Sequence, residues 1–312
     1  MSVVLQKVRT LLELVKFEHS VFALPYAYIG ALYGAATVEF AVPAIYPVPA
    51  PRPTPWVTLL KWPTLSALVW ITVAMVGARA FAFVLNRAID KEIDARNPRT
   101  VGRAVPAGRI KAWELWLFAS VMLVAYLYAA LRLAPLTQVL WPIPLVAFVV
   151  YPYTKRFTPM CHYWLGICLG LAPVAGWIAV GAPISAAAPW VLGVAVALWT
   201  AGFDMIYATQ DVECDVRDHL HSMPADLGVA AALVQTRITH VATVLLLLVA
   251  GVLVGAGWSW YVGIGVAAAL LWYENSIVHA DDLSRVDAAF FTVNGVIAVV
   301  VFAGALADRL LG

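Results

Sequence analysis

Residues 64–88 read TLSALVWITVAMVGARAFAFVLNRA, an apolar run that ends in polar residues and leads directly to Asp90 and Asp94. A helix that crosses a membrane needs about 20 mostly apolar residues. Comparable windows recur near residues 12–36, 112–131, 137–153, 162–181, 189–208, 232–254, 257–277 and 288–307. The pattern predicts about nine transmembrane helices, of which the one over 137–153 is short.

The composition requires lipid around most of the chain. Hydrophobic residues make up 63% of the 312 positions and charged residues 12%, about half the charged fraction of a soluble domain. The apolar runs are too long for the strands of a membrane barrel, and a backbone in lipid must satisfy its own hydrogen bonds. We expect an all-α, polytopic membrane bundle. We expect it to form a single domain over residues 1–312, because no polar stretch could carry a separate core.

The basic residues are distributed unevenly between the two sides of the predicted membrane. If the amino terminus is cytoplasmic, the outer segments hold only Arg52, Lys61, Arg132 and Arg309. The inner segments hold Lys7, Arg9, Lys16, Arg87, Lys91, Arg96, Arg99, Arg103, Arg109, Lys111, Lys155, Arg156, Arg217, Arg237 and Arg285. By the positive-inside rule, we expect a multi-pass protein of the plasma membrane whose inner loops face the cytoplasm.

Three connections between the predicted spans are distinctive. Residues 37–63 contain seven prolines, which exclude a helix and favour an extended outer loop. Residues 90–111 and 209–226 are polar and rich in charge, and each carries aspartates four residues apart near its start. Loops of this length are often functional, so we expect these two inner loops to carry the site.

The first acidic cluster lies at the end of the run quoted above. Asn86, Asp90 and Asp94 are spaced by four residues, so on a helix their side chains share one face. Arg79, seven residues before Asn86, falls on the same face.

The second cluster has the same spacing. Asp204, Tyr207, Asp211 and Asp215 fall within a narrow arc of a helix, whereas Glu213 points elsewhere. Carboxylates on adjacent turns repel one another, and ionised groups near a membrane are costly unless they are paired or functional. Mg²⁺ removes this difficulty, since it takes one or two carboxylates together with phosphate oxygens and water. Two such clusters suit Mg²⁺ ions bridged by a diphosphate.

Basic residues that could hold this anion lie close by in the sequence. Arg99 and Arg103 follow the first cluster, and Lys155 lies in the short loop after Tyr151. Arginine binds phosphate oxygens in pairs, and lysine acts as a point charge. Arg79 lies inside an apolar helix and therefore needs an anionic partner.

These motifs resemble the signatures of a known family. Asn86-x-x-x-Asp90-x-x-x-Asp94 with the following Arg-Asn-Pro-Arg-Thr resembles the first signature of the UbiA superfamily of intramembrane prenyltransferases. Tyr207-x-x-x-Asp211-x-x-x-Asp215 resembles the second signature, and Tyr151-Pro-x-x-Lys155-Arg156 the loop between them. Arg87 departs from the pattern, since many relatives carry an aspartate there. The segments 16–19, 202–204 and 281–285 further resemble the quinone-pathway members, such as 4-hydroxybenzoate polyprenyltransferases.

The resemblance implies a helical ring around a central cavity that opens to lipid. It implies Mg²⁺ as cofactor, with Asn86, Asp90, Asp94, Asp211 and Asp215 as ligands. It also implies that the diphosphate is held by Arg79, Arg99, Arg103 and Lys155. The expected partners are a polyprenyl diphosphate, a small aromatic acceptor and membrane lipid, with no nucleic acid.

The roles of several residues stay open from the sequence. Tyr151 and Tyr207 could shield an allylic cation with their ring faces, or could simply pack. Asp204 could position a hydroxyl group, bind a basic partner such as Arg79, or assist deprotonation.

The expected reaction is Mg²⁺-dependent transfer of a polyprenyl group to a 4-hydroxybenzoate-like acceptor in quinone biosynthesis. Alternative acceptors are a naphthoate, a futalosine-type quinone precursor, a porphyrin or a glycerol-phosphate lipid. A transporter is the main alternative from another class, because intramembrane acids also mark ion pathways. The position of the acids at inner helix ends, beside arginines, favours phosphate binding instead.

Overall fold

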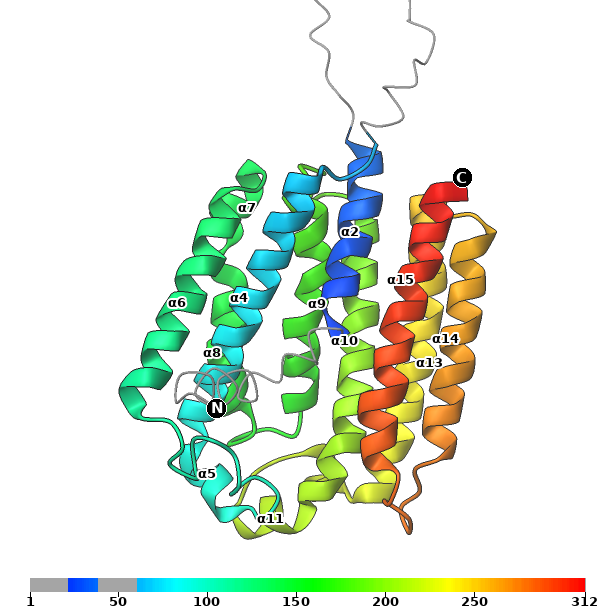
Figure 1. The fold of residues 1–312 in the computed structure, drawn as a ribbon. Coiled ribbons are helices and arrows are strands. Elements are labelled where there is room, and N and C mark those ends of the chain that lie inside the picture. The colour runs from blue at the N-terminus through cyan, green and yellow to red at the C-terminus, as the bar shows by residue number, and fades with distance from the viewer. Residues whose placement is uncertain (1–21, 39–60, 312) are drawn as a thin grey trace, which may run out of the picture.

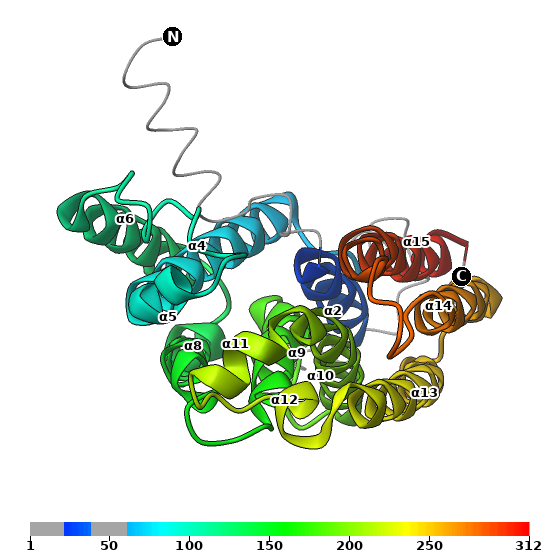
Figure 2. The same ribbon diagram turned by 90° about the horizontal axis from the view of Figure 1, so that it is seen from below.

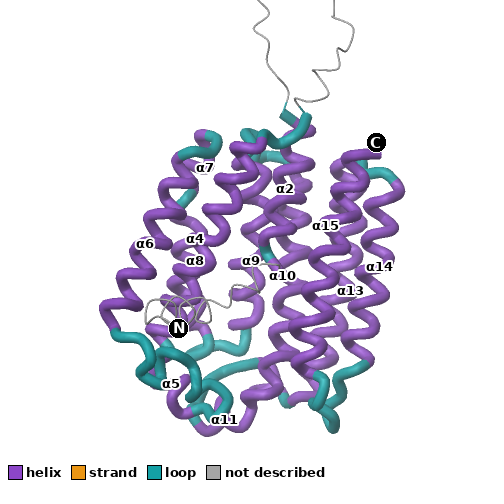
Figure 3. The backbone as a smooth tube through the Cα atoms, viewed as in Figure 1, coloured by secondary structure: helices purple, strands orange, loops and turns teal. Residues whose placement is uncertain are grey.

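The apolar runs form long helices in the computed structural model, which describes residues 22–38 and 61–311 (Figure 1). The described part of the chain contains no strand (Figure 3). The long helices are α2 (Leu24–Thr37), α4 (Leu65–Ile89), α6 (Ala112–Leu131), α8 (Pro142–Thr154), α9 (Cys161–Ala179), α10 (Ala187–Ala208), α13 (Val229–Val254), α14 (Trp258–Ser276) and α15 (Asn294–Leu311). The prediction of an all-α membrane bundle is confirmed.

Seven segments of the described chain are long and apolar enough to cross a membrane. One combines the short helix α7 (Pro135–Leu140) with α8, so the predicted short span extends over Pro135–Thr154. Helix α14 is not among the seven, although its 19 residues pack against α13 and α15. Helix α2 has 14 described residues. The number of nine spans therefore stays a prediction.

Close backbone contacts hold α2, α9 and α10 together. A Cβ atom on Gly30 of α2 would lie 2.0 Å from the carbonyl oxygen of Pro173 in α9. A Cβ on Gly176 of α9 would lie 1.9 Å from the carbonyl oxygen of Ala27 in α2. Small residues let helix backbones approach in this way within membranes. These glycines fix α2 against α9, which forms one wall of the cavity described below.

Gly176→Ala is therefore expected to destabilise the protein by about 1–3 kcal/mol, because overpacking forces the two backbones apart. Gly265 of α14 is the matched control, since a Cβ there meets nothing within 4 Å. Denaturant unfolding in detergent, followed by tryptophan fluorescence, measures both variants. Equal stability of the Gly176→Ala and Gly265→Ala proteins would contradict the contact.

The two acidic segments are more helical than expected of loops. Residues 90–111 contain α5 (Lys91–Arg96). Residues 209–226 contain the 3₁₀ turn η2 (Thr209–Asp211), α11 (Val212–Arg217) and most of α12 (Met223–Leu227). Figures 1 and 2 show that α5 and α11 lie at the same end of the bundle. The fold thus brings the two motifs together at one membrane face.

The sequence analysis placed each motif on the face of a helix, but neither motif lies on one continuous helix. Helix α4 ends at Ile89, and α10 ends at Ala208. The four-residue step of the first motif survives the break, because the Asp90 amide donates to the Asn86 carbonyl at 2.9 Å and the Asp94 amide to the Asp90 carbonyl at 2.8 Å. Segment 16–19 and nearly all of the proline-rich stretch 37–63 lie outside the described residues.

Candidate active site

A single cavity of about 610 Å³ contains every site residue predicted from the sequence. Its walls come from α4, α8, α9 and α10 together with the two acidic segments. The predicted residues in its lining are Arg79, Asn86, Asp90, Asp94, Arg99, Arg103, Tyr151, Lys155, Asp204, Tyr207, Asp211 and Asp215. Glu213 is exposed and does not line the cavity. The residues predicted from the sequence thus lie around one cavity, and their roles stay predictions.

In the first cluster, each carboxylate is paired with a basic side chain. Asp94 is buried and binds the guanidinium groups of Arg103 at 2.7 Å and Arg87 at 3.2 Å. Asp90 binds Arg156 at 2.9 Å and accepts a hydrogen bond from the Asn86 amide at 3.3 Å.

Burial raises the pKa of Asp90 to about 6, although Arg156 opposes that shift. Burial disfavours the charged form of this carboxyl, so a nearby positive group keeps it ionised at neutral pH.

In the second cluster, Asp211 binds two residues of the loop that follows the first cluster. The Arg99 guanidinium donates to both carboxylate oxygens of Asp211, one of these bonds being 3.0 Å long. The Asn97 amide donates to the same carboxylate at 2.7 Å. Arg99 also donates to the Tyr207 hydroxyl at 2.7 Å, and its guanidinium lies 4.8 Å above the Tyr207 ring. These bonds join the two motifs directly.

Asp215 is the most buried of the paired acids, with a 2% exposed side chain. The Lys155 ammonium binds it at 2.7 Å, and the Ser222 hydroxyl donates to its other oxygen at 2.9 Å. Burial works against the charge on Lys155, yet the charge and bond of Asp215 raise the pKa of that lysine overall. Lys155 therefore stays cationic beside the second cluster.

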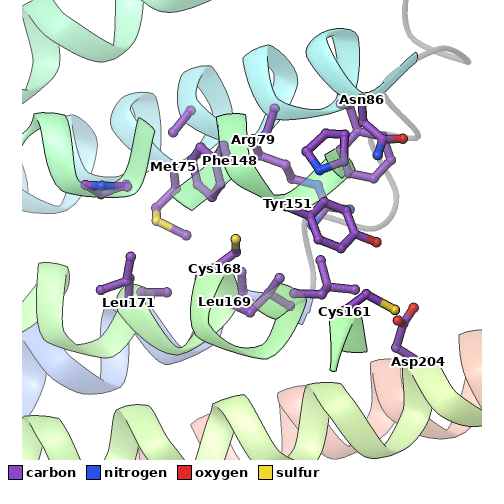
Figure 4. A pocket seen from close by; sticks show the side chains of 18 of the residues that line it. Met75, Arg79, Asn86, Phe148, Tyr151, Cys161, Cys168, Leu169, Leu171 and Asp204 are labelled. Carbon is purple, nitrogen blue, oxygen red and sulfur yellow. The ribbon is translucent and has the colours of Figure 1, made fainter. Parts of the chain in front are cut away.

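Two further charged residues of the lining, Arg79 and Asp204, lie seven residues before Asn86 and Asp211, about two helical turns along the chain. Figure 4 shows Arg79, Asn86 and Asp204. Asp204 does not pair with Arg79; its partner is His162, at 2.7 Å. The Nε atom of Arg79 is buried without a hydrogen-bond partner among the described residues, and its guanidinium lies 4.8 Å above the Phe83 ring. Arg79 is thus an unpaired cation in the cavity wall of the described structure.

The remaining wall of the cavity is apolar. Figure 4 shows Met75, Phe148, Leu169 and Leu171 around the space beyond Arg79 and Tyr151. Close to the charged end, the Tyr207 ring stacks on Phe290 at a centroid distance of 4.1 Å. Phe290 belongs to the π-helical segment η3 (Ala288–Val293), a rare geometry that is frequent at functional sites. The cavity is amphipathic, with a charged end and an apolar extension.

The donor set fits magnesium bound together with a phosphate ligand. Among the described residues, no three acidic, histidine or cysteine side chains converge on one point. Mg²⁺ is usually held by one or two carboxylates plus phosphate oxygens and water, so such convergence is not required. Asp90 and Asp94 on one side and Asp211 and Asp215 on the other supply the hard oxygen ligands.

Among the residues that bind the acids of the site, Arg87, Asn97 and His162 were not predicted from the sequence. Arg87 was treated as a neutral departure from the family pattern, yet it binds Asp94. Asn97 and His162 bind acids that are 114 and 42 residues away in the chain. For His162 a signal existed, because an ionisable residue within an apolar helix is a functional candidate by default.

The fold and the cavity together define a polytopic membrane protein that can bind a molecule with an anionic head and an apolar tail. Residues 53–296 match the UbiA prenyltransferase family, and the chain belongs to this family. This membership gives the transporter alternative no support.

The chain is similar to two bacterial proteins named 4-hydroxybenzoate octaprenyltransferase. The protein of Neisseria gonorrhoeae (strain NCCP11945) is 30% identical over 235 residues, covering 72% of this chain and 77% of the relative. That of Cupriavidus necator is 30% identical over 262 residues, covering 79% and 90%.

Two solved structures share the fold. The apo structure of a UbiA homolog from Aeropyrum pernix K1 has a TM-score of 0.78 and 29% identity, covering 93% of this chain and 98% of that one. A UbiA homolog from Archaeoglobus fulgidus, bound to GPP and Mg²⁺, has a TM-score of 0.68 and 20% identity, covering 96% and 99%. The second likeness concerns the fold alone.

Proposed function

We propose that the protein transfers a polyprenyl group from polyprenyl diphosphate to an aromatic acceptor of the 4-hydroxybenzoate type, with Mg²⁺, in quinone biosynthesis. The observation that carries the proposal is the amphipathic cavity, in which all the predicted site residues meet. Its charged end suits a diphosphate, and its apolar extension suits a prenyl chain. The names of the two bacterial relatives support the acceptor class, and the ligands of the Archaeoglobus fulgidus homolog support a prenyl diphosphate with Mg²⁺.

In this proposal, Arg99, Arg103 and Lys155 bind the diphosphate and neutralise the charge that develops on it as the bond to the allylic carbon breaks. Arg79 is available for a further anionic group. Asn86, Asp90, Asp94, Asp211 and Asp215 would hold Mg²⁺, which when bound supplies additional positive charge against the leaving diphosphate.

Aromatic side chains would protect the reacting carbon. The ring faces of Tyr151 and Tyr207 shield the positive allylic carbon from water. A carbon of the acceptor ring forms the new carbon–carbon bond, and the hydrogen on that carbon leaves as a proton.

The charged end of the cavity is lined by residues of the two acidic segments, and α5 and α11 of these segments lie at the same end of the bundle (Figure 1). We propose that this face is cytoplasmic and that the membrane is the plasma membrane, since the basic residues concentrate there. A small, charged acceptor would then reach the site from the cytoplasm, while the prenyl chain stays in lipid.

Purified protein in detergent is expected to convert geranyl diphosphate and 4-hydroxybenzoate to a prenylated product when Mg²⁺ is present. EDTA should abolish product, and excess Mg²⁺ should restore it; mass spectrometry of the product gives the readout. If Mg²⁺-dependent binding of geranyl diphosphate occurs without product, the acceptor class is wrong. If folded protein shows neither binding nor product, the proposed reaction itself is refuted.

A further inference from the structure

A buried asparagine lies where the π-helical segment η3 meets α15. The side chain of Asn294 is fully buried and has hydrogen-bond partners on three elements. The Trp199 indole of α10 donates to its Oδ1 atom at 2.7 Å. Its Nδ2 atom donates to Oε1 of Glu274 in α14 at 2.6 Å and to the carbonyl oxygen of Ala289 in η3 at 3.0 Å. Asn294 therefore joins η3 to α10 and to α14, which lies beside α15 (Figure 2).

These partners leave one orientation for the amide of Asn294. An indole N–H can only donate, so the atom that faces Trp199 must be the oxygen. The nitrogen carries two hydrogens, and the two acceptors Glu274 and Ala289 take both of them. A buried polar group with all its donors satisfied holds its neighbours in one arrangement. The bond to Ala289 reaches back five residues, the step of a π-helix, and so fixes the wide turn of η3 itself.

The carboxyl group of Glu274 is costly to bury at this place. Glu274 is fully buried, and its second oxygen, Oε2, has no hydrogen-bond partner among the described residues. An unsatisfied buried acceptor lowers stability, whereas an apolar pair of the same shape would be nearly neutral or stabilising. Neither Glu274 nor Asn294 lines the cavity of the described structure. The pair therefore suits a role in placing η3 better than a role in stability alone or in direct contact with a substrate.

The residue that η3 brings to the cavity is Phe290, the neighbour of Ala289. Phe290 lines the cavity, and its ring stacks on Tyr207 with 4.1 Å between the centroids and 26° between the planes. It also meets the Phe203 ring of α10 edge to face at 5.3 Å. The Tyr207 hydroxyl accepts a hydrogen bond from Arg99, whose guanidinium lies over the Tyr207 ring. The place of the Tyr207 ring thus depends on Phe290 as well as on Arg99.

We infer that Asn294 is a positioning residue, which fixes η3 so that Phe290 holds the Tyr207 ring beside the reacting carbon. The inference rests on the proposed function, in which Tyr207 shields the allylic carbon from water. When the ring is displaced, water attacks that carbon: a carbon–oxygen bond to water forms, the bond to the diphosphate oxygen breaks, and geraniol, diphosphate and a proton are released. Asn294 therefore controls how the donor divides between the acceptor and water.

The test measures the ratio of geraniol to prenylated 4-hydroxybenzoate. Purified protein in detergent receives geranyl diphosphate, 4-hydroxybenzoate and Mg²⁺, and mass spectrometry quantifies both products after subtraction of the geraniol formed with EDTA. Phe290→Ala and Asn294→Leu should each raise the ratio by about two- to tenfold, the range for loss of one aromatic pair. A smaller folded fraction alone would lower both products equally and leave the ratio unchanged.

Further variants test whether Asn294 acts through Phe290 and Glu274. In a protein with both Phe290→Ala and Asn294→Leu the two increases should not multiply, because substitutions that disrupt one contact are not independent. Glu274→Leu should raise the ratio as Asn294→Leu does. Glu274→Gln should stay within about twofold of wild type, because its amide oxygen can still accept the bond from Asn294.

Tyr33→Phe is the matched control. The Tyr33 hydroxyl donates to Asp308 at 2.9 Å, a buried hydrogen bond that joins α2 to α15. Tyr33 does not line the cavity of the described structure. Loss of this bond should lower the unfolding temperature and leave the ratio unchanged.

An unchanged ratio in folded Asn294→Leu protein would overturn the inference. Increases that multiply in the double variant would overturn it too, as would an equal increase in Tyr33→Phe. Should Asn294→Leu fail to fold, the comparison of Glu274→Leu with Glu274→Gln decides the same question.

The outcome for wild type separates this inference from the proposed function. If wild type forms geraniol but no prenylated product, the proposed acceptor is wrong, and the rate of geraniol formation replaces the ratio. That rate should rise in Asn294→Leu, and an unchanged or lower rate would overturn the inference. A folded wild type that forms neither product refutes the proposed function, and the inference with it.

Discussion

Asp211→Asn is expected to lower prenyl transfer by about 10²- to 10³-fold, the usual cost of removing one electrostatic contributor to a transition state. The substitution keeps the shape of the side chain and removes the negative charge that both Arg99 and Mg²⁺ would need. In the described structure Asp211 receives Arg99 and Asn97 from the segment after the first motif. Its loss therefore weakens the contact between the two motifs as well as the metal site.

Glu213→Gln is the matched control for this substitution. Glu213 lies two residues away, carries the same charge and is exposed outside the cavity. Initial rates at saturating Mg²⁺ and donor, together with thermal unfolding of each protein, separate loss of chemistry from loss of fold. Unchanged activity in Asp211→Asn, or an equal loss in Glu213→Gln, would exclude the second motif from the reaction.

The second large effect concerns how Mg²⁺ and the prenyl diphosphate bind. In the described structure the acids and bases of the site are paired with one another: Arg103 with Asp94, Arg156 with Asp90, Arg99 with Asp211 and Lys155 with Asp215. Mg²⁺ alone would take a carboxylate and leave a basic residue without its partner. Diphosphate alone would take the base and leave a buried carboxylate uncompensated, which is costly. When both ligands bind, the carboxylates would have Mg²⁺ as their partner and the basic residues would have the diphosphate.

We therefore expect Mg²⁺ to raise the affinity for geranyl diphosphate by at least about tenfold, equivalent to 1.4 kcal/mol of coupling. The thermal shift produced by both ligands should exceed the sum of the separate shifts. Arg99→Gln should reduce the coupling, whereas Arg285→Gln, exposed and outside the cavity, should leave it unchanged. Geraniol, which lacks the diphosphate, should show no coupling. Additive shifts in wild type would contradict the exchange of partners.

The sequence was sufficient to predict the helical class and a set of residues that line one cavity, but not the contacts between these residues. Long apolar runs report helices directly, and the four-residue spacing of Asn86, Asp90 and Asp94 holds across the helix break at Asp90. The break itself was not predicted, because an acidic face at helical spacing fits an unbroken helix equally well. The same limit applies to the end of α10 at Ala208.

The partners of the acids depend on tertiary structure. Asn97 meets Asp211, and His162 meets Asp204, only because α5, α9 and α10 converge at one end of the bundle. A local sequence pattern cannot predict a contact between residues that are so far apart in the chain. Arg79 illustrates the reverse case: its need for an anion was evident from its place in an apolar helix, but the described residues provide none. The diphosphate of the proposed donor would supply such an anion.

The apolar wall formed by Met75, Phe148 and Leu171 affects which concentration governs the binding of a prenyl donor. A donor whose tail rests against such a wall is supplied from the bilayer, and the concentration that governs its binding is its mole fraction in the lipid. In the proposed function the acceptor, in contrast, would be supplied from bulk water, and its binding would follow its molar concentration. The two proposed substrates would thus reach the site from different phases, one from the two-dimensional bilayer and the other from bulk water. Expanding the membrane area at constant buffer volume dilutes one of them and leaves the other unchanged.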